Sequence, residues 1–237
     1  MRHDPAVWRL ALEALETGVP AALLYVVESL GSSPGRAGFA LCLTADAAAG
    51  SIGGGAMEHR FTASVRASLA EGRCAPSLVR QIHDSEAETD RSGMICSGEQ
   101  TFVVLPLASG DALAVQAVLE AVSQRKPGVL SLSLRGLAFD PSAQLKGRDS
   151  FVPGPDWIYS EDLAQADKLH IVGGGHCALA LSQLAAGLDF DITVYDDRPG
   201  LPTWEANSWA HSKVLVPDYT AVGGLIPPGD HQYIFAS

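Results

Sequence analysis

Glycine-rich turns are the features of this sequence most able to do chemistry, and the first of them lies in GSIGGGAMEH. Its adjacent glycines, Gly53, Gly54 and Gly55, join a strand-like segment to a helical one, so their backbone N–H groups could be presented to an anion. The turn lacks the Gly-Lys-Ser/Thr ending of a P-loop, which argues against nucleoside triphosphate hydrolysis. Glu58 would repel a phosphate unless its carboxylate caps the helix. A tight turn with close backbone packing is the plainer interpretation.

The loop GSSPGRAG, which begins at Gly31, offers the hydroxyl of Ser33 and the guanidinium of Arg36. A guanidinium can hold a phosphate through two parallel hydrogen bonds. A single surface arginine is more often only solvated. We therefore expect a binding role only if this loop lies beside the first glycine turn, as connected neighbouring strands would allow.

Cys96, in the small-residue string SGMICSGE, is the candidate for soft-metal or sulfur chemistry. A thiolate near backbone amides or an arginine could ligate a soft metal or accept sulfur. The alternative is a half-buried, inert thiol. The other cysteines (Cys42, Cys74 and Cys177) form no C-x-x-C pair. Neither a disulfide framework nor a zinc site is expected, and no Ser/His/Asp order indicates a hydrolase, so we assign no catalytic residue.

The second glycine turn, GGGHCA from Gly173 to Ala178, is a G-x-G-x-x-A form of the Rossmann fingerprint. It follows an apolar strand and opens a helix, with Gly173 making the tight turn and Gly175 letting a phosphate approach the backbone. Asp196 stands about 20 residues further on, where a carboxylate that accepts from a ribose 2′-OH and favours NAD is expected. His176 would orient the turn or a ligand phosphate. A Rossmann domain without a ligand is the alternative.

Hydrophobic periodicity predicts the elements that would position these residues. Helices are expected at 4–17, at 111–124, and after the first glycine turn as far as Gly72. Apolar or alternating runs predict strands in PAALLYVVES, FALCLT, SLVRQIHD, EQTFVVLPL and GVLSLSLRG. Beyond residue 167 the pattern changes to short βαβ units, which imply a parallel sheet.

The expected fold class is α/β, with two domains. A small N-terminal α+β domain (1–140) precedes a linker (141–166) rich in Pro, Gly, Ser and Asp, with room for a short strand at WIYS. A Rossmann-like domain with a parallel sheet follows (167–237). It offers four strand candidates where a full dinucleotide domain has about six, so we expect a fold shortened at its C-terminus.

Composition narrows the classes of protein. Hydrophobic residues make up 47% of the 237 residues and charged residues 18%, which favours a folded chain with a substantial core. The 27 Asp and Glu outnumber the 16 Lys and Arg, and the net charge of −11 disfavours a nucleic-acid-binding protein. Neither a long apolar run nor a secretory signal is found, so we expect a cytoplasmic protein without a membrane span.

Four ordered strings together resemble the xanthine dehydrogenase accessory protein family (XdhC/CoxI). They are VVESLGSSPGRAGFALCLT, GSIGGGAMEHR, SGMICSGEQTFVVLPL, and HIVGGGHCALALSQLA with VYDDRP, and they span residues 26–199. The order and the strings GSIGGGAME and GMICSGE are specific, whereas the Rossmann segment alone would not be.

The resemblance implies a chaperone for the molybdenum cofactor (molybdopterin), which performs no turnover of its own. Such a protein favours the sulfurated cofactor and passes it to a xanthine dehydrogenase-like molybdoenzyme, and the implied partners include a cysteine desulfurase and a second copy of the chain. The ligand-facing positions that the resemblance implies are Arg36, Gly53 to Gly55 and Cys96, with Cys96 on the metal, and the Ser33 hydroxyl is a further candidate for contact with the cofactor.

Two departures from the family pattern bear on that expectation. Some relatives carry a cysteine where this chain has Ala56, and if that cysteine contacts molybdenum in them, either Cys96 takes its place here or the metal contact is absent. A Y-I-G-x-I-G-S-like segment of relatives is not found in this sequence. Two other functions stay open. One is an NAD(P)-dependent oxidoreductase that uses Gly173, Gly175, His176 and Asp196, and the other is a scaffold that docks a partner enzyme, with both glycine turns purely structural.

Overall fold

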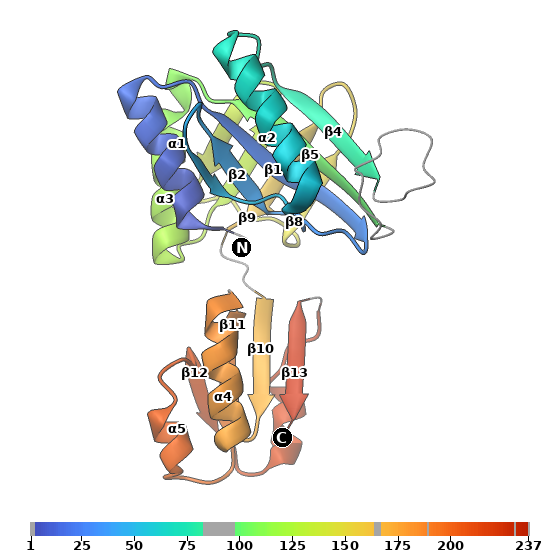
Figure 1. The fold of residues 1–237 in the computed structure, drawn as a ribbon. Coiled ribbons are helices and arrows are strands. Elements are labelled where there is room, and N and C mark those ends of the chain that lie inside the picture. The colour runs from blue at the N-terminus through green and yellow to red at the C-terminus, as the bar shows by residue number, and fades with distance from the viewer. Residues whose placement is uncertain (1–2, 83–97, 164–166, 189, 230, 237) are drawn as a thin grey trace. The chain divides into compact units, whose positions relative to one another are not determined.

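The computed structural model describes residues 3–82, 98–163, 167–188, 190–229 and 231–236 (Figure 1). The chain divides into an N-terminal unit, Met1–Ala164, and a C-terminal unit, Gln165–Ser237. The N-terminal unit is α+β and the C-terminal unit has a parallel sheet, which confirms the predicted fold class.

A five-stranded antiparallel sheet forms the centre of the N-terminal unit, in the order β3-β2-β1-β5-β4. Its strands are β1 (Ala22–Gly31), β2 (Ala40–Leu43), β3 (Ala48–Gly50), β4 (Ser77–Ile82) and β5 (Gly98–Pro106). β1 pairs with β5 so that Gly31 lies opposite Gly98. The last residue of β1 and the first residue of β5 therefore lie side by side at one end of the sheet, where the loop from β1 to β2 begins.

Helix α2 (Gly55–Ala70) covers one face of this sheet. Its spacing of four aligns Met57, Phe61 and Val65 against the sheet, and the ring of Phe61 meets that of Phe102 edge-on at a centroid distance of 4.8 Å. Because α2 begins at Gly55, the last glycine of the first turn, this packing fixes where the turn lies.

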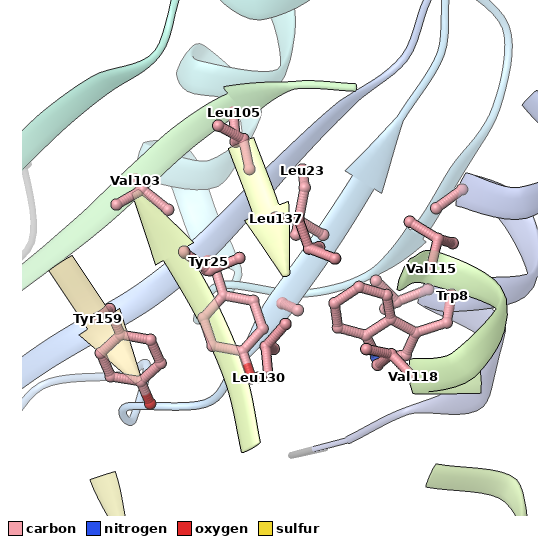
Figure 2. Packing of buried hydrophobic residues seen from close by; sticks show 14 of the residues in the cluster. Trp8, Leu23, Tyr25, Val103, Leu105, Val115, Val118, Leu130, Leu137 and Tyr159 are labelled. Atoms are coloured by element: carbon pink, nitrogen blue, oxygen red, sulfur yellow. The ribbon is translucent and has the colours of Figure 1, made fainter. Parts of the chain in front are cut away.

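The other face packs against α1 (Pro5–Thr17), α3 (Ala112–Gln124) and a second antiparallel sheet, in the order β7-β6-β9-β8. Figure 2 shows Trp8, Tyr25 and Tyr159 in this core, with centroid distances of 6.4 Å from Trp8 to Tyr25 and 5.6 Å from Tyr25 to Tyr159. The strands of the second sheet are β6 (Val129–Ser133), β7 (Gly136–Asp140), β8 (Asp149–Val152) and β9 (Ile158–Asp162).

This second sheet differs from the linker expected at 141–166. β8 and β9 lie within that range, β9 pairs with β6 so that Tyr159 lies opposite Leu132, and both of these side chains are fully buried. Residues 141–163 thus belong to the N-terminal unit. β9 overlaps the short strand expected at WIYS, whereas β8 was not expected, because a strand of four residues with two apolar side chains does not stand out among the surrounding Pro, Gly and Asp.

The C-terminal unit is a parallel sheet in the order β12-β11-β10-β13. α4 connects β10 to β11 and packs Ala178 against Ile171 and Val194. Because β10 lies between β11 and β13, α4 begins where the strand order reverses, as in a Rossmann fold. The elements are β10 (Asp167–Val172), α4 (His176–Ala185), β11 (Phe190–Asp196), α5 (Pro202–Ala206), β12 (Ser212–Leu215) and β13 (Gln232–Ala236), with short 3-10 turns at Ser109–Asp111, Ala186–Leu188 and Tyr219–Gly224.

Within the described ranges, no helix combines the length and the apolar character needed to cross a membrane.

Candidate functional site

Three segments that are distant in the sequence meet around the side chain of Gln100. This residue lies on β5 and is 1% exposed. Its Nε2 donates to the carbonyl of Ile52 at 2.8 Å, which holds the first glycine turn. Its Oε1 accepts from the N–H of Gly35 at 3.2 Å and from the hydroxyl of Ser33 at 3.1 Å, which holds the loop between β1 and β2. One carboxamide therefore joins the loop, the turn and the sheet.

Glycines let these segments approach more closely than other residues would. A Cβ atom on Gly35 would lie 2.2 Å from the carbonyl oxygen of Ile52, and one on Gly98 would lie 2.5 Å from the backbone of Ser32. Gly53 has a φ of +129°, and its Cβ would lie 2.8 Å from the Gly35 nitrogen. The loop thus lies beside the first glycine turn, the condition under which we expected Arg36 to have a binding role.

We expected the N–H groups of the first glycine turn to be free to bind an anion, but two of its three glycines donate to groups of the protein. Oε2 of Glu58 accepts from the N–H of Ile52 at 2.7 Å and from the N–H of Gly54 at 3.0 Å. The Ser51 hydroxyl also donates to this oxygen at 2.7 Å, and it accepts from the N–H of Gly53 at 3.1 Å. Glu58 therefore caps the turn as an internal anion, and Gly53 and Gly54 do not present free N–H groups.

The open donors lie one residue further on. Gly55 and Ala56 begin α2 and are exposed, and no hydrogen-bond partner for their N–H groups is found among the described residues. Arg36 is exposed as well, and its Nη1 donates to the carbonyl of Gly31 at 3.3 Å. We expected the Ser33 hydroxyl to face a ligand. Instead, Ser33 is 7% exposed and its hydroxyl donates to Gln100, which holds the loop in place.

The candidate metal ligand Cys96 lies outside the described residues. Among the other cysteines, burial raises the pKa of the Cys42 thiol to about 12 and also raises the pKa of Cys74, so neither favours the thiolate form. Cys177 is exposed at the start of α4. In the part of the chain that the structure describes, no group of three or more His, Cys, Asp and Glu residues could hold a metal ion.

The second glycine turn has the backbone of a Rossmann turn. Gly173 has a φ of +106°, and its N–H donates to the carbonyl of Tyr195 at 2.8 Å. No atom of the described residues lies within 4 Å of a Cβ built on Gly175, and His176 is exposed at the first position of α4. A phosphate could approach this turn, as the fingerprint predicts.

The carboxylate of Asp196 is already engaged, which differs from its expected role with a ribose. It is fully buried, and its oxygens accept from Nε of Arg198 at 3.0 Å, from Nη2 of Arg198 at 2.9 Å, and from the N–H of Gly174. The hydrogen bonds from Arg198 and Gly174 hold the pKa of Asp196 well below its usual range, and the pKa of Arg198 is raised. A ribose hydroxyl would have to displace one of these donors.

Sequence reasoning missed Gln100 and Arg198. Gln100 lies between the polar residues Glu99 and Thr101 in GEQTFVVLPL, and a polar residue at the start of a strand did not point to three partners that are 48 to 67 positions away. Arg198 is two residues from Asp196, and that spacing could have indicated the ion pair.

The fold and the paired glycine turns define a protein with an α+β unit followed by a Rossmann-like unit. Residues 7–81, from α1 into β4, match the XdhC and CoxI family. This match confirms the resemblance drawn from the sequence, and it covers the first two of the four strings, VVESLGSSPGRAGFALCLT and GSIGGGAMEHR.

A solved crystal structure of a protein described as a xanthine dehydrogenase from Bacillus halodurans is similar over 95% of this chain and 74% of its own. The TM-score is 0.53 and the sequence identity is 19%, so this likeness supports the fold alone. No curated protein matches the chain.

Proposed function

We propose that this protein is an accessory factor that holds the molybdenum cofactor as cargo and delivers it to a xanthine dehydrogenase-like molybdoenzyme, without turnover of its own. The observation that carries the proposal is the convergence on Gln100 of two of the segments in which the sequence resembles the family. The family match over residues 7–81 supports an accessory role.

The donors at this site suit the anionic end of molybdopterin. The Arg36 guanidinium and the N–H groups of Gly55 and Ala56 are exposed and could hold its phosphate. Glu58 limits the site, because its carboxylate already occupies the neighbouring amides and repels a second anion there. A soft ligand for molybdenum would have to come from Cys96.

An exposed site of this kind suits a carrier, since cargo must leave as well as bind. The chain has a net charge of −11, so the long-range field disfavours an anionic ligand and binding depends on the local donors. The proposal extends to a homodimer and to a cysteine desulfurase as the source of sulfur for the cofactor. The oxidoreductase alternative has no comparable support, because Asp196 is already held by Arg198 and Gly174.

Anaerobic binding of molybdopterin to the purified protein tests the proposal, with bound molybdenum and pterin measured after gel filtration. We expect near-stoichiometric binding by the wild type. Arg36→Ala should weaken it at least about tenfold, because a hydrogen bond to a charged group contributes about 1.5–3 kcal/mol. Cys96→Ala should also weaken it, and Arg135→Ala, which removes an exposed arginine from the turn between β6 and β7, is the control.

Wild-type affinity in both Arg36→Ala and Cys96→Ala would refute the assigned site. A pull-down with the client enzyme separates the carrier from a docking scaffold. A carrier should capture the cofactor-free client and release it once the client is loaded, whereas a scaffold would hold both forms equally.

A further inference from the structure

We propose that Gln100 is the positioning residue of the candidate site. Its buried carboxamide holds the loop that carries Arg36 and the first glycine turn in the arrangement that binds the cargo, although Gln100, at 1% exposure, touches no ligand itself. The identity of the cargo rests on the proposed function, whereas the positioning role is drawn from the hydrogen bonds.

Both ends of the carboxamide are used, and each end holds a different segment. The nitrogen donates to the Ile52 carbonyl of the turn, and the oxygen accepts from the Gly35 N–H and the Ser33 hydroxyl of the loop. Glutamine supplies a donor and an acceptor on one rigid plane. An apolar side chain at this position would leave buried backbone groups of both segments unsatisfied.

The loop and the turn depend on this side chain for their connection. Among the described residues, no direct hydrogen bond joins residues 32–36 to residues 51–55. Their own contact is the close approach of the Gly35 and Gly53 backbones, which is steric and supplies no directional bond. Gln100 therefore provides the hydrogen-bonded link between them.

Gln100 can position the exposed donors of the site because they are close in sequence to the residues that it holds. Arg36 is the next residue after Gly35, and Gly55 is two residues after Gly53. Because the Gly35 and Gly53 backbones touch, fixing them also fixes the backbone of Arg36 and the first amides of α2 at one end of the sheet. Without that link, ordering both segments would add an entropic cost to binding.

Gln81 offers a matched control. It lies on β4 directly opposite Gln100 in the register and is 7% exposed. Its Nε2 donates to the carbonyl of its own neighbour Arg80 at 2.8 Å, and within the described ranges no hydrogen bond joins Gln81 to the loop or the turn. Gln81→Leu thus removes a buried carboxamide from the same sheet without touching the proposed link.

The first experiment is hydrogen exchange of the ligand-free proteins. Gln100→Leu should speed amide exchange in residues 32–36 and 51–54 about tenfold more than Gln81→Leu does. Gln100→Glu keeps the acceptor for the loop but loses the donor to Ile52, so exchange should rise mainly in the turn. Ser33→Ala, a milder change, should raise exchange in the loop alone. It keeps the test available if Gln100→Leu does not fold.

The second experiment measures molybdopterin affinity in the same proteins. We expect Gln100→Leu to bind at least about tenfold more weakly than Gln81→Leu at equal thermal stability, a difference that corresponds to about 1.4 kcal/mol. Equal affinity of these two variants, or equal exchange, overturns the positioning role while the proposed function stands. Failure of the wild type to bind overturns the proposed function instead, and the exchange data then decide alone whether Gln100 links the two segments.

Discussion

Single residues near the first glycine turn divide into those that hold the structure and those that remain open to a ligand. Glu58 and Ser33 have the chemistry of a binding site, yet their polar groups are used inside the protein. Arg36 and the amide of Gly55 are exposed. Residue type predicted which groups could bind an anion, but the partner of each group decided which ones are available.

The buried carboxylate of Asp196 gives a prediction about pH. Its pKa is lowered in the folded protein by Arg198 and by the Gly174 N–H, so its contribution to stability is present above its unfolded pKa of about 3.9. That contribution is lost as the pH falls below this value toward the folded pKa. Asp196→Asn should therefore reduce the acid-induced loss of protection in β10 and β11.

Hydrogen exchange of β10 and β11 at pH 6 and pH 3 measures this effect, and Asp197→Asn, a change of a more exposed neighbouring carboxylate, is the control. An equally steep loss of protection between these two pH values in Asp196→Asn and wild type would contradict the prediction.

The close packing of the loop against the first glycine turn can be tested by a substitution at Gly35. Gly35→Ala places a methyl group 2.2 Å from the Ile52 carbonyl oxygen, a backbone atom that cannot rotate away. We expect a loss of about 1–3 kcal/mol in the free energy of unfolding, the usual range for overpacking. Gly110→Ala is the control, because its added Cβ atom has no neighbour within 4 Å in the part of the chain that the structure describes. Urea unfolding measures both, and similar midpoints would refute the close approach.

The elements themselves were predictable where local signals are strong. The helix expected at 4–17 is α1, since Asp4 caps it by accepting from Ala6 at 2.9 Å and Gly18 ends it with a φ of +72°. β8 and β9 were not predicted as a sheet, because their pairing with β6 depends on contacts that are remote in the sequence. For the same reason, the link through Gln100 could not be derived from strand periodicity.

At the scale of the whole molecule, the order of motifs was enough to predict an α+β unit followed by a Rossmann-like unit. It was not enough to predict which donors are occupied. In each of the two glycine turns, an N–H group donates to a carboxylate of the protein: Gly54 to Glu58 of α2, and Gly174 to Asp196 at the end of β11. In both turns an internal anion occupies part of the place that the pattern suggests for a ligand.

Net charge gives a prediction about how the cargo arrives. With −11 charges, the chain repels an anionic ligand at long range, while Arg36 attracts it locally. Removing Arg36 leaves mainly the repulsive field, and salt screens that field over about 10 Å at 0.1 M. When NaCl is raised from about 20 to about 200 mM, the rate constant for association of Arg36→Ala with molybdopterin should therefore rise more steeply than that of the wild type. Stopped-flow pterin fluorescence measures both rates. A slower association of Arg36→Ala at high salt would mean that other positive groups guide the ligand, and the local site would then have to include them.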